Sequence, residues 1–400
     1  MLRQVEGSQA VAETVAHCRP QVISAYPISP QTHVVEHLSR LVRSEELLGC
    51  AYLTVESEFA ALSSLVGASA AGSRTYTATA SQGLLFMAEA VFNVAGLGFP
   101  VVMTVANRAI GAPINIWNDQ GDSIAMRDAG WVQLYAADNQ AAADLHVVAF
   151  MVAEHLSVPV MVCMDGFVLT HAFEEVDVPC QQDVDAVLPP FRPRQLLDPA
   201  APVSIGAMVG PEAYTEVRYL ADKRLRSALD ALPAAADRLA EVVGRPIQAL
   251  VRPYACHGAR TVVVAMGSVL GTLTEVVDER LARGERVGAL GITCFRPFPA
   301  AAARAVLSGA DEVLVLERSL AAGEDGPLTA EVARALAGSR ARVRTVVAGL
   351  GGRPVTGHEL HGLLDRARRG RLGTRTFLDL DHDVVAREQH RDALDQEVAP

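Results

Sequence analysis

AYLTVESEFAALSSLVGASAAGSRTYTATASQGLLFMAEAVFNVAGLGFPVVMTVA, residues 51–106, alternates short β-branched runs with longer stretches rich in Ala, Gly and Leu. The runs 51–55, 74–80 and 100–106 are almost free of charge, which is typical of strands that are buried on both faces. The stretches between them are long enough to form crossover helices. The segment therefore predicts a βαβαβ unit with a parallel sheet.

The same alternation continues on both sides of this segment. In the first half it predicts further strands at 22–27, 131–136 and 159–164, with helices at 31–46 and 138–155. In the second half it predicts strands at 261–267, 286–292, 311–317 and 341–347, again separated by helical stretches. The expected fold class is α/β: a doubly wound parallel-sheet domain followed by a smaller α/β domain.

A break in composition separates the two parts. Residues 186–200 are rich in proline, and residues 211–243 carry alternating charges typical of a solvated or bridging helix. We therefore expect a first domain over 1–245, which includes this linker and helix, and a second domain over 255–375. Residues 376–400 are expected to form a surface arm at the C-terminus.

Composition excludes several classes of partner. Half of the residues are apolar, and the formal charge is 35 − 46 = −11. This charge disfavours binding to nucleic acid or to an anionic membrane surface, because both require clustered basic residues. The apolar stretch at residues 145–164 is interrupted by His146, Glu154 and His155, and the N-terminus lacks a signal-peptide pattern. We expect a cytoplasmic protein with no nucleic-acid or membrane partner.

Two patterns bear on metal binding. The six cysteines include no CxxC pair, so we expect reduced thiols and neither an iron–sulfur cluster nor a zinc knuckle on this chain. HVVEH, residues 33–37, matches the H-x-x-E-H pattern of a zinc peptidase family, with His33 and His37 on one helix face. Its strand–turn–helix surroundings do not fit that use, so no metal is predicted here.

Polar residues follow several predicted strands, where ligands bind in open α/β sheets. In AYPISPQTH, residues 25–33, prolines on both sides of Ser29 would hold its hydroxyl in place. In TATASQG, residues 77–83, Ser81 and Gln82 offer polar contacts and Gly83 permits close approach of a ligand. Both segments also fit ordinary turns that cap the following helix.

The densest polar segment is VANRAIGAPINIWNDQGD, residues 105–122. Arg108 follows an apolar strand there, and its guanidinium is suited to clamping a carboxylate with two hydrogen bonds. The alternative is a structural arginine that pairs with Asp119 or Asp122, since buried charges are usually paired.

Two acidic residues stand at the start of the helix 57–72, which is otherwise made of small and apolar residues. Glu56 and Glu58 are the last charges before Arg74. A carboxylate in this position is either a solvated residue that interacts with the helix dipole or one directed into the protein for a chemical purpose. The residues alone leave both interpretations open.

Several of these segments together resemble the alpha subunit of pyruvate:ferredoxin oxidoreductase and its 2-oxoacid:ferredoxin relatives. The resemblance covers residues 1 to about 375 in the same order. It is carried by AYPISPQTHVVE, VESEFAAL, TATASQGLLFM, NRAIGAPINIWND, VVVAMGSVLGT, FRPFP and LERSLAAGEDGPL. It implies a pyrimidine-type thiamine-diphosphate domain followed by a transketolase-C-terminal-like domain. The implied activity is oxidative decarboxylation of a 2-oxoacid to acyl-CoA, with CO2 and reduced ferredoxin as the other products.

The resemblance also implies partners. In that family a beta subunit holds the diphosphate and Mg²⁺, iron–sulfur clusters lie on beta and delta subunits, and a gamma subunit completes the assembly. Ferredoxin and CoA are the further reactants. In agreement, MDGF at 164–167 and GEDG at 323–326 lack the Asn half of a diphosphate-binding GDG…NN motif. We therefore expect this chain to be inactive alone.

The site residues are implied in the same way. Glu58 takes the place of the family glutamate that activates the aminopyrimidine, a role that desolvation favours. Ser29 takes the place of a hydroxyl residue, usually Thr, that contacts substrate, and Arg108 takes the place of the carboxylate-binding arginine. Further expected contacts are Pro30, Ser81, Gln82 and Gly83 to the cofactor and Asn115 to the substrate.

Two alternatives remain open at this point. A paralogous thiamine-dependent subunit could act on another 2-oxoacid or another acceptor, since Ser29 changes the shape of the pocket. A non-catalytic docking subunit could have kept the fold alone. The presence of Glu58, Arg108 and Ser29 together counts against the second alternative.

Overall fold

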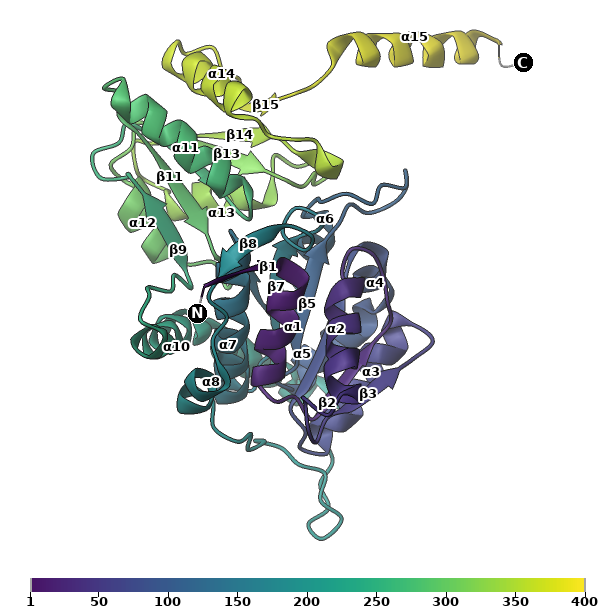
Figure 1. The fold of residues 1–400 in the computed structure, drawn as a ribbon. Helices are drawn as coiled ribbons and strands as arrows, with labels where there is room; N and C mark the ends of the chain where they lie inside the picture. The colour runs from purple at the N-terminus through teal and green to yellow at the C-terminus, as the bar shows by residue number, and fades with distance from the viewer. Residues whose placement is uncertain (1, 399–400) are drawn as a thin grey trace.

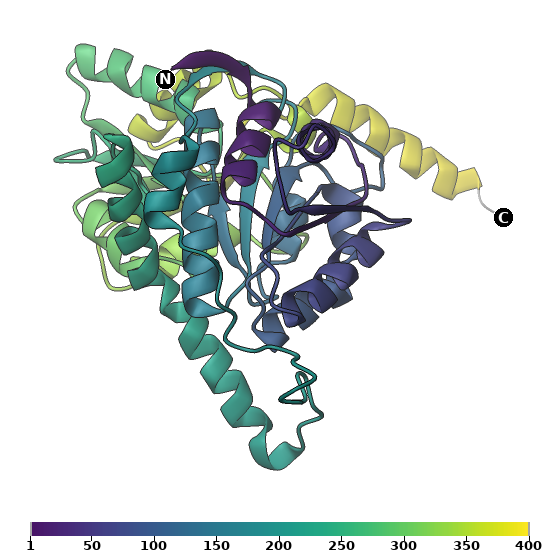
Figure 2. The ribbon, with the colours of Figure 1, turned by 60° about the horizontal axis from the view of Figure 1, so that its bottom comes forward.

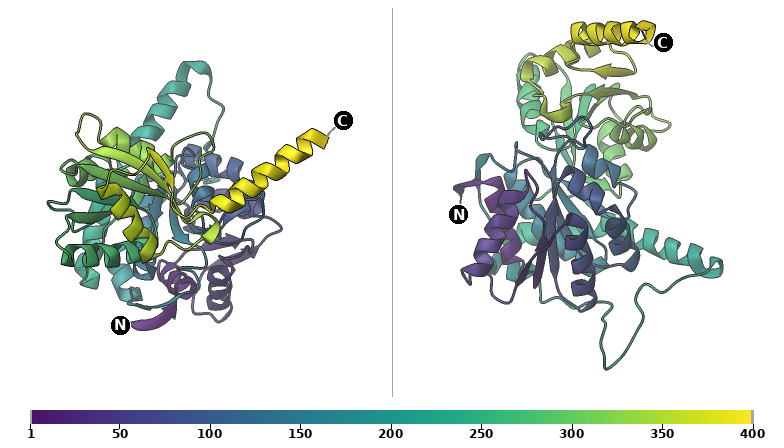
Figure 3. Two further views of the ribbon diagram at one scale, coloured as in Figure 1. Left: turned by 90° about the horizontal axis from the view of Figure 1, so that it is seen from above. Right: turned by 90° about the vertical axis from the view of Figure 1, so that its right-hand side faces the viewer.

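The computed structural model describes residues 2–398, and residues 392–398 by their backbone alone. The chain forms two units, each built on a largely parallel sheet (Figure 1). The second unit lies against the end of the first unit at which most of its strands terminate, which we call the carboxyl edge (Figure 3).

A seven-stranded sheet forms the centre of the first unit. Its strands, in spatial order, are β12 (Cys294–Arg296), β6 (Val132–Tyr135), β7 (Val160–Asp165), β5 (Val102–Asn107), β4 (Thr75–Thr79), β2 (Val22–Ala25) and β3 (Ala51–Thr54). All neighbours are parallel except β12 and β6. Strands β4 to β7 are buried along their whole length, which confirms the prediction of a sheet covered on both sides.

Helices cover both faces of this sheet. One face packs against α1 (Gly7–His17), α2 (Thr32–Arg43) and α7 (Asn139–Leu156). The other face packs against α3 (Glu58–Ala70), α4 (Ser81–Phe86) and α5 (Ala88–Leu97). The two apolar cores on either side of the sheet confirm the doubly wound α/β architecture.

A six-stranded sheet forms the second unit. Its strands, in spatial order, are β15 (Arg375–Phe377), β14 (Arg342–Val347), β13 (Glu312–Glu317), β10 (Thr261–Ala265), β11 (Val287–Ile292) and β9 (Val251–Tyr254). All pairs are parallel except β9 with β11. One face packs against α11 (Val269–Ala282) and α14 (Gly357–Arg368), and the other against α12 (Ala300–Leu307) and α13 (Pro327–Ala335). The core beneath α12 and α13 is continuous with a core of the first unit.

The structure contains elements that the sequence analysis does not predict. Strand β12 comes from the second half of the chain but pairs with β6 in the first sheet. Strands β1 (Arg3–Glu6) and β8 (Phe173–Val176) form a separate antiparallel ribbon. Their sequences RQVE and FEEV each bury a single valine, so they carry little hydrophobic signal. Short elements complete the chain: α6 (Gly121–Ala125), α8 (Gln181–Val187) and the 3₁₀ turn η1 (Leu350–Gly352).

The expected helix over 211–243 is interrupted at Ser227, between α9 (Pro211–Arg226) and α10 (Ala228–Val243). Helix α10 packs on the first unit, whereas α9 buries no residue and extends away from the body (Figure 2). The expected C-terminal arm contains the helix α15 (His382–Val398), which projects from the second unit (Figures 1 and 3). Among the described helices, none combines the length and the apolar content that crossing a bilayer requires.

Candidate active site

The carboxyl edge of the first sheet has a topological switch point at β2. The chain runs from β2 outward to β3 on one side and then continues on the other side through β4 and β5. Ligands of open α/β sheets bind in the crevice outside such a point, because the connections leave in opposite directions there. The segments that contain Ser29, Glu58 and Ser81 follow β2, β3 and β4 respectively. The fold therefore brings these three segments to one edge.

Glu58 is the buried member of the acidic pair at the start of α3. It is the first residue of the helix, and the side chain of Ser57 caps that helix by accepting a hydrogen bond from the N–H of Ala60 at 3.1 Å. Glu58 is 7% exposed, whereas Glu56 is exposed. Among the residues that the structure describes, none forms a hydrogen bond with the Glu58 carboxylate. A buried carboxylate without a protein partner is costly, and a ligand that supplies a hydrogen bond would offset that cost.

The turn after β4 forms the wall beside this carboxylate. A Cβ atom on Gly83 would lie 2.7 Å from Glu58 Oε1 and 2.7 Å from Thr79 Oγ1, so a larger residue there would displace one of these side chains. The hydroxyl of Thr79 is buried and also has no partner among the described residues. Two polar groups that have no partner among the described residues therefore lie side by side at the switch point.

Arg108 and Ser29 meet at the same edge. The guanidinium of Arg108 donates to the carbonyl of Ser29 at 2.8 Å and to the carbonyl of Asn115 at 3.4 Å. Among the side chains that the structure describes, residues 2–391, no carboxylate forms an ion pair with Arg108. The alternative of a structural pair with Asp119 or Asp122 is therefore wrong, and the guanidinium keeps the capacity to bind a carboxylate.

Asp122 organises two of these segments. Its carboxylate accepts hydrogen bonds from the backbone N–H groups of Ser81 at 2.9 Å, of Arg108 at 3.0 Å and of Ser123 at 2.7 Å. The side-chain amide of Asn107 donates a further bond at 2.7 Å. Burial raises the pKa of Asp122 to about 6, and these hydrogen bonds oppose the rise. Asp122 thus ties the turn after β4 to the end of β5.

We expect Asp122→Asn to lower the free energy of unfolding at pH 7 by about 1–3 kcal/mol, because the new amide NH2 would face backbone N–H donors. The raised pKa in the folded state means that the wild type loses stability as the pH rises from about 4 to about 6. The variant should lack this part of the pH dependence. Urea unfolding of the chain at several pH values checks both effects. The exposed Asp128→Asn serves as the control, and equal stability of the two variants would contradict the assignment.

The loop after Arg108 also contacts the second unit. The side chain of Asn115 donates to the carbonyl of Gly351 at 3.1 Å, and the N–H of Gln120 donates to the carbonyl of Arg318 at 2.8 Å. Arg318 forms a buried ion pair with Asp165 at the end of β7. Asn115 therefore directs its side chain to the second unit, and only its carbonyl lies near Arg108.

The remaining predicted contacts surround the same edge. Pro30 is buried, and a Cβ atom on Gly166 would lie 2.5 Å from its Cγ. The hydroxyl of Ser81 donates to the carbonyl of Ala109 and also lies against the side-chain oxygen of Gln82, so protein groups already engage it. Gln82 is half-buried.

A cavity of about 730 Å³ lies elsewhere, at the amino edge of the first sheet. Its lining includes Gly130 and Ser157, which precede β6 and β7. It is therefore separate from the site described above.

The fold and the site define a class of protein: a doubly wound α/β protein whose switch point holds a buried carboxylate and an arginine that pairs with no described carboxylate. Residues 13–232 match the family described as pyruvate flavodoxin/ferredoxin oxidoreductase, thiamine-diphosphate-binding, and residues 259–360 match pyruvate:ferredoxin oxidoreductase core domain II. The chain belongs to this family and is a subunit of a 2-oxoacid:ferredoxin oxidoreductase.

Similar proteins agree with this assignment. Pyruvate synthase subunit PorA of Methanosarcina barkeri is 45% identical, with 95% of this chain and 97% of that protein covered. Its counterpart in Methanothermobacter thermautotrophicus is 43% identical, with 92% and 95% covered. A solved 2-oxoglutarate:ferredoxin oxidoreductase from Magnetococcus marinus, with 2-oxoglutarate, coenzyme A and succinyl-CoA bound, has a TM-score of 0.74 at 19% identity. That match covers 93% of this chain and 65% of that chain, and it supports the fold alone.

Proposed function

We propose that this chain is the alpha-type subunit of an enzyme that converts pyruvate, CoA and oxidised ferredoxin into acetyl-CoA, CO2 and reduced ferredoxin. The observation that carries the proposal is the buried carboxylate of Glu58, which has no protein partner described here and lies at the switch point of a thiamine-diphosphate-binding domain. The names of the similar PorA proteins support pyruvate as the substrate.

In this proposal Glu58 is the residue that activates the cofactor. When bound, thiamine diphosphate supplies the electron sink for decarboxylation. A carboxyl group hydrogen-bonded to a pyrimidine ring nitrogen shares a proton with that ring. It thereby favours the tautomer whose exocyclic nitrogen can accept a proton. Glu58 fits this role because it is desolvated, its oxygens have no described protein donor, and Gly83 leaves no side chain between it and the turn.

Arg108 and Ser29 would hold the oxoacid. The Arg108 guanidinium donates hydrogen bonds to two carbonyl groups, and none of the described carboxylates neutralises its charge. A substrate carboxylate would provide the missing negative charge through charge-assisted hydrogen bonds. Ser29 is exposed next to this guanidinium and offers a hydroxyl from the same turn.

A partner subunit would complete the site. The loop after Arg108 exposes large apolar side chains, with Ile114 at 83% and Trp117 at 54% exposure. Exposed apolar residues beside a binding site are typical of an interface with another protein. We infer that a beta subunit which carries the diphosphate and Mg²⁺ covers this loop. Iron–sulfur clusters would reside on the beta and delta subunits, with a gamma subunit as a further partner.

A substrate screen of the assembled complex tests the proposed reaction. Release of CO2 is followed with a dye acceptor for pyruvate, 2-oxoglutarate and branched-chain 2-oxoacids. We expect the highest kcat/KM for pyruvate. A higher value for another oxoacid would replace pyruvate as the substrate, and absence of turnover with all of them would favour a docking role for this chain.

A further inference from the structure

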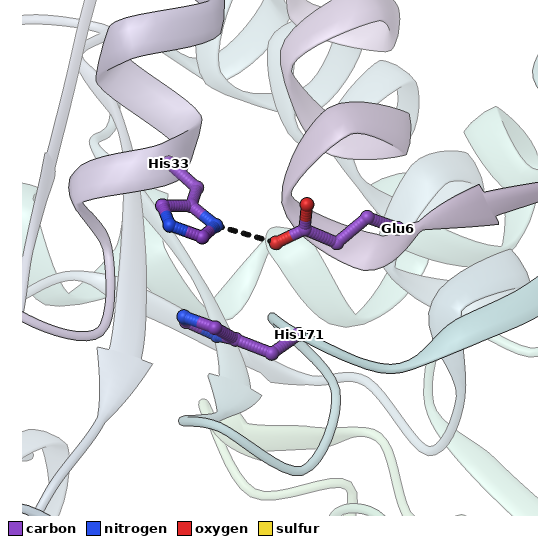
Figure 4. Close-up of side chains that lie close together, drawn as sticks. All are labelled: Glu6, His33 and His171. Atoms are coloured by element: carbon purple, nitrogen blue, oxygen red, sulfur yellow. Dashed lines mark hydrogen bonds and ion pairs between the residues drawn. The ribbon is translucent and has the colours of Figure 1, made fainter.

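Three side chains that could ligate a metal meet where the first residues of the chain pack on the first unit. Glu6, His33 and His171 each offer one ligand atom, and these atoms all lie within 4.8 Å of one another (Figure 4). Glu6 ends β1, His33 lies in the first turn of α2, and His171 lies between β7 and β8. The cluster therefore joins three segments that are far apart in the sequence.

Backbone hydrogen bonds hold two of these segments together. The N–H of Ser8 donates to the carbonyl of Thr170 at 3.0 Å. The N–H of Gly7 donates to the carbonyl of Ala172, which follows His171, also at 3.0 Å. Pairing of β1 with β8 continues this contact. A Cβ atom on Gly7 would lie 2.1 Å from a carbonyl oxygen of the facing segment, so this close approach requires glycine. Glu6 and His171 are thus fixed relative to each other.

The side chains already interact. Nδ1 of His33 lies 2.6 Å from Oε1 of Glu6, and the imidazole rings of His33 and His171 are 4.5 Å apart between centroids. The hydroxyl of Thr170 lies 2.7 Å from Nδ1 of His171. A hydrogen bond from the second ring nitrogen to a neighbouring oxygen is how proteins orient a ligating histidine.

We propose that Glu6, His33 and His171 bind one Zn²⁺ ion or a similar divalent transition metal. Two imidazole nitrogens and one carboxylate oxygen are a ligand set that zinc accepts, with water in the fourth position. Mg²⁺ and Ca²⁺ prefer sites made of oxygen atoms alone. The side chain of His33 is 45% exposed, so an ion can reach the cluster from solvent. The bound ion would link β1 and α1 to α2 and to the segment before β8.

This site differs from the H-x-x-E-H pattern in HVVEH. His33 takes part in it, but Glu36 of that pattern is exposed and His37 does not belong to the cluster. The ligands that join His33 come from distant segments, so the spacing within one helix does not reveal them. The proposal thus departs from the expectation that this chain binds no metal.

Metal titration of the full-length chain tests the proposal. After treatment with EDTA, Co²⁺ is added while its visible d–d absorption is recorded, and Zn²⁺ is then used to displace it. We expect one equivalent of Co²⁺ to bind, Zn²⁺ to displace it, and millimolar Mg²⁺ to have no effect. His33→Ala and His171→Ala should each weaken Zn²⁺ binding by more than about 100-fold, beyond the 10- to 100-fold range of second-shell changes. The control is His155→Ala, an exposed histidine at the end of α7, which should bind as the wild type does.

Melting curves separate loss of the ligand from loss of the fold. Each variant is melted without metal to show that it is folded, and again with excess Zn²⁺. A bound ion raises the melting temperature of the wild type by mass action, whereas the two ligand variants should show no rise. A wild-type chain without saturable Co²⁺ absorption, or equal Zn²⁺ affinity in a His33→Ala/His171→Ala double variant, would overturn the proposal.

Discussion

Glu58→Gln is expected to lower the turnover of the assembled enzyme by about 10²- to 10⁴-fold, the range in which a positioned acid–base group contributes. The substitution keeps the size of the side chain and removes its ability to share a proton. Because the Glu58 side chain is buried, bulk water has little access to the position from which its carboxyl group would share the proton. The measurement is kcat for oxidation of pyruvate by the reconstituted complex with a dye acceptor.

The chain offers a matched control for this prediction. Glu56→Gln makes the same chemical change two residues away, but Glu56 is exposed and should leave kcat within about twofold of the wild type. An equal fall of kcat in both variants would indicate that either substitution disturbs the structure at the start of α3. Unchanged turnover in Glu58→Gln would favour a non-catalytic docking subunit.

Arg108→Ala is expected to raise KM for the oxoacid by about 10²-fold. A hydrogen bond to a charged group contributes about 1.5–3 kcal/mol, and the guanidinium can offer two of them to a carboxylate. The affinity of the complex for thiamine diphosphate should change little, because Arg108 is assigned to the substrate. Steady-state kinetics and calorimetric titration of the cofactor measure the two quantities separately.

The reverse result would refute this assignment. If Arg108→Ala bound thiamine diphosphate weakly and kept its KM for pyruvate, the arginine would belong to the cofactor site. Arg43→Ala, at the exposed end of α2, controls for the loss of a positive charge and should behave as the wild type. Arg108→Lys should recover only part of the affinity, since lysine cannot form the two-pronged contact.

The regular parts of this fold could be predicted because burial leaves a periodic pattern. The apolar runs around Thr75–Thr79 and Val102–Asn107 carry that pattern along their whole length. Strand β12 could not be predicted as part of the first sheet, because its pairing with β6 depends on how the second unit packs. The ribbon of β1 and β8 is too short and too polar to leave a hydrophobic signal.

The site likewise has features that the sequence predicts and features that depend on tertiary contacts. The sequence motifs placed Glu58, Ser29 and Arg108 after strands, and the parallel sheet brings such positions to one edge. Glu58 is buried against the turn that contains Gly83, whereas Glu56 is exposed, and no local pattern records this difference. The role of Asp122 could not be predicted, because most of its partners are backbone N–H groups, which are the same in every sequence.

Glu58 is proposed to promote the transfer of one proton at the cofactor, and hydrogen–deuterium exchange at C2 of the thiazolium ring measures this transfer. The exchange rate is obtained by acid quenching and NMR of thiamine diphosphate bound to the assembled complex in D2O without substrate. We expect Glu58→Gln to slow exchange by at least about 10²-fold and Glu56→Gln to leave it unchanged. Exchange in Glu58→Gln at the wild-type rate would show that Glu58 does not activate the cofactor.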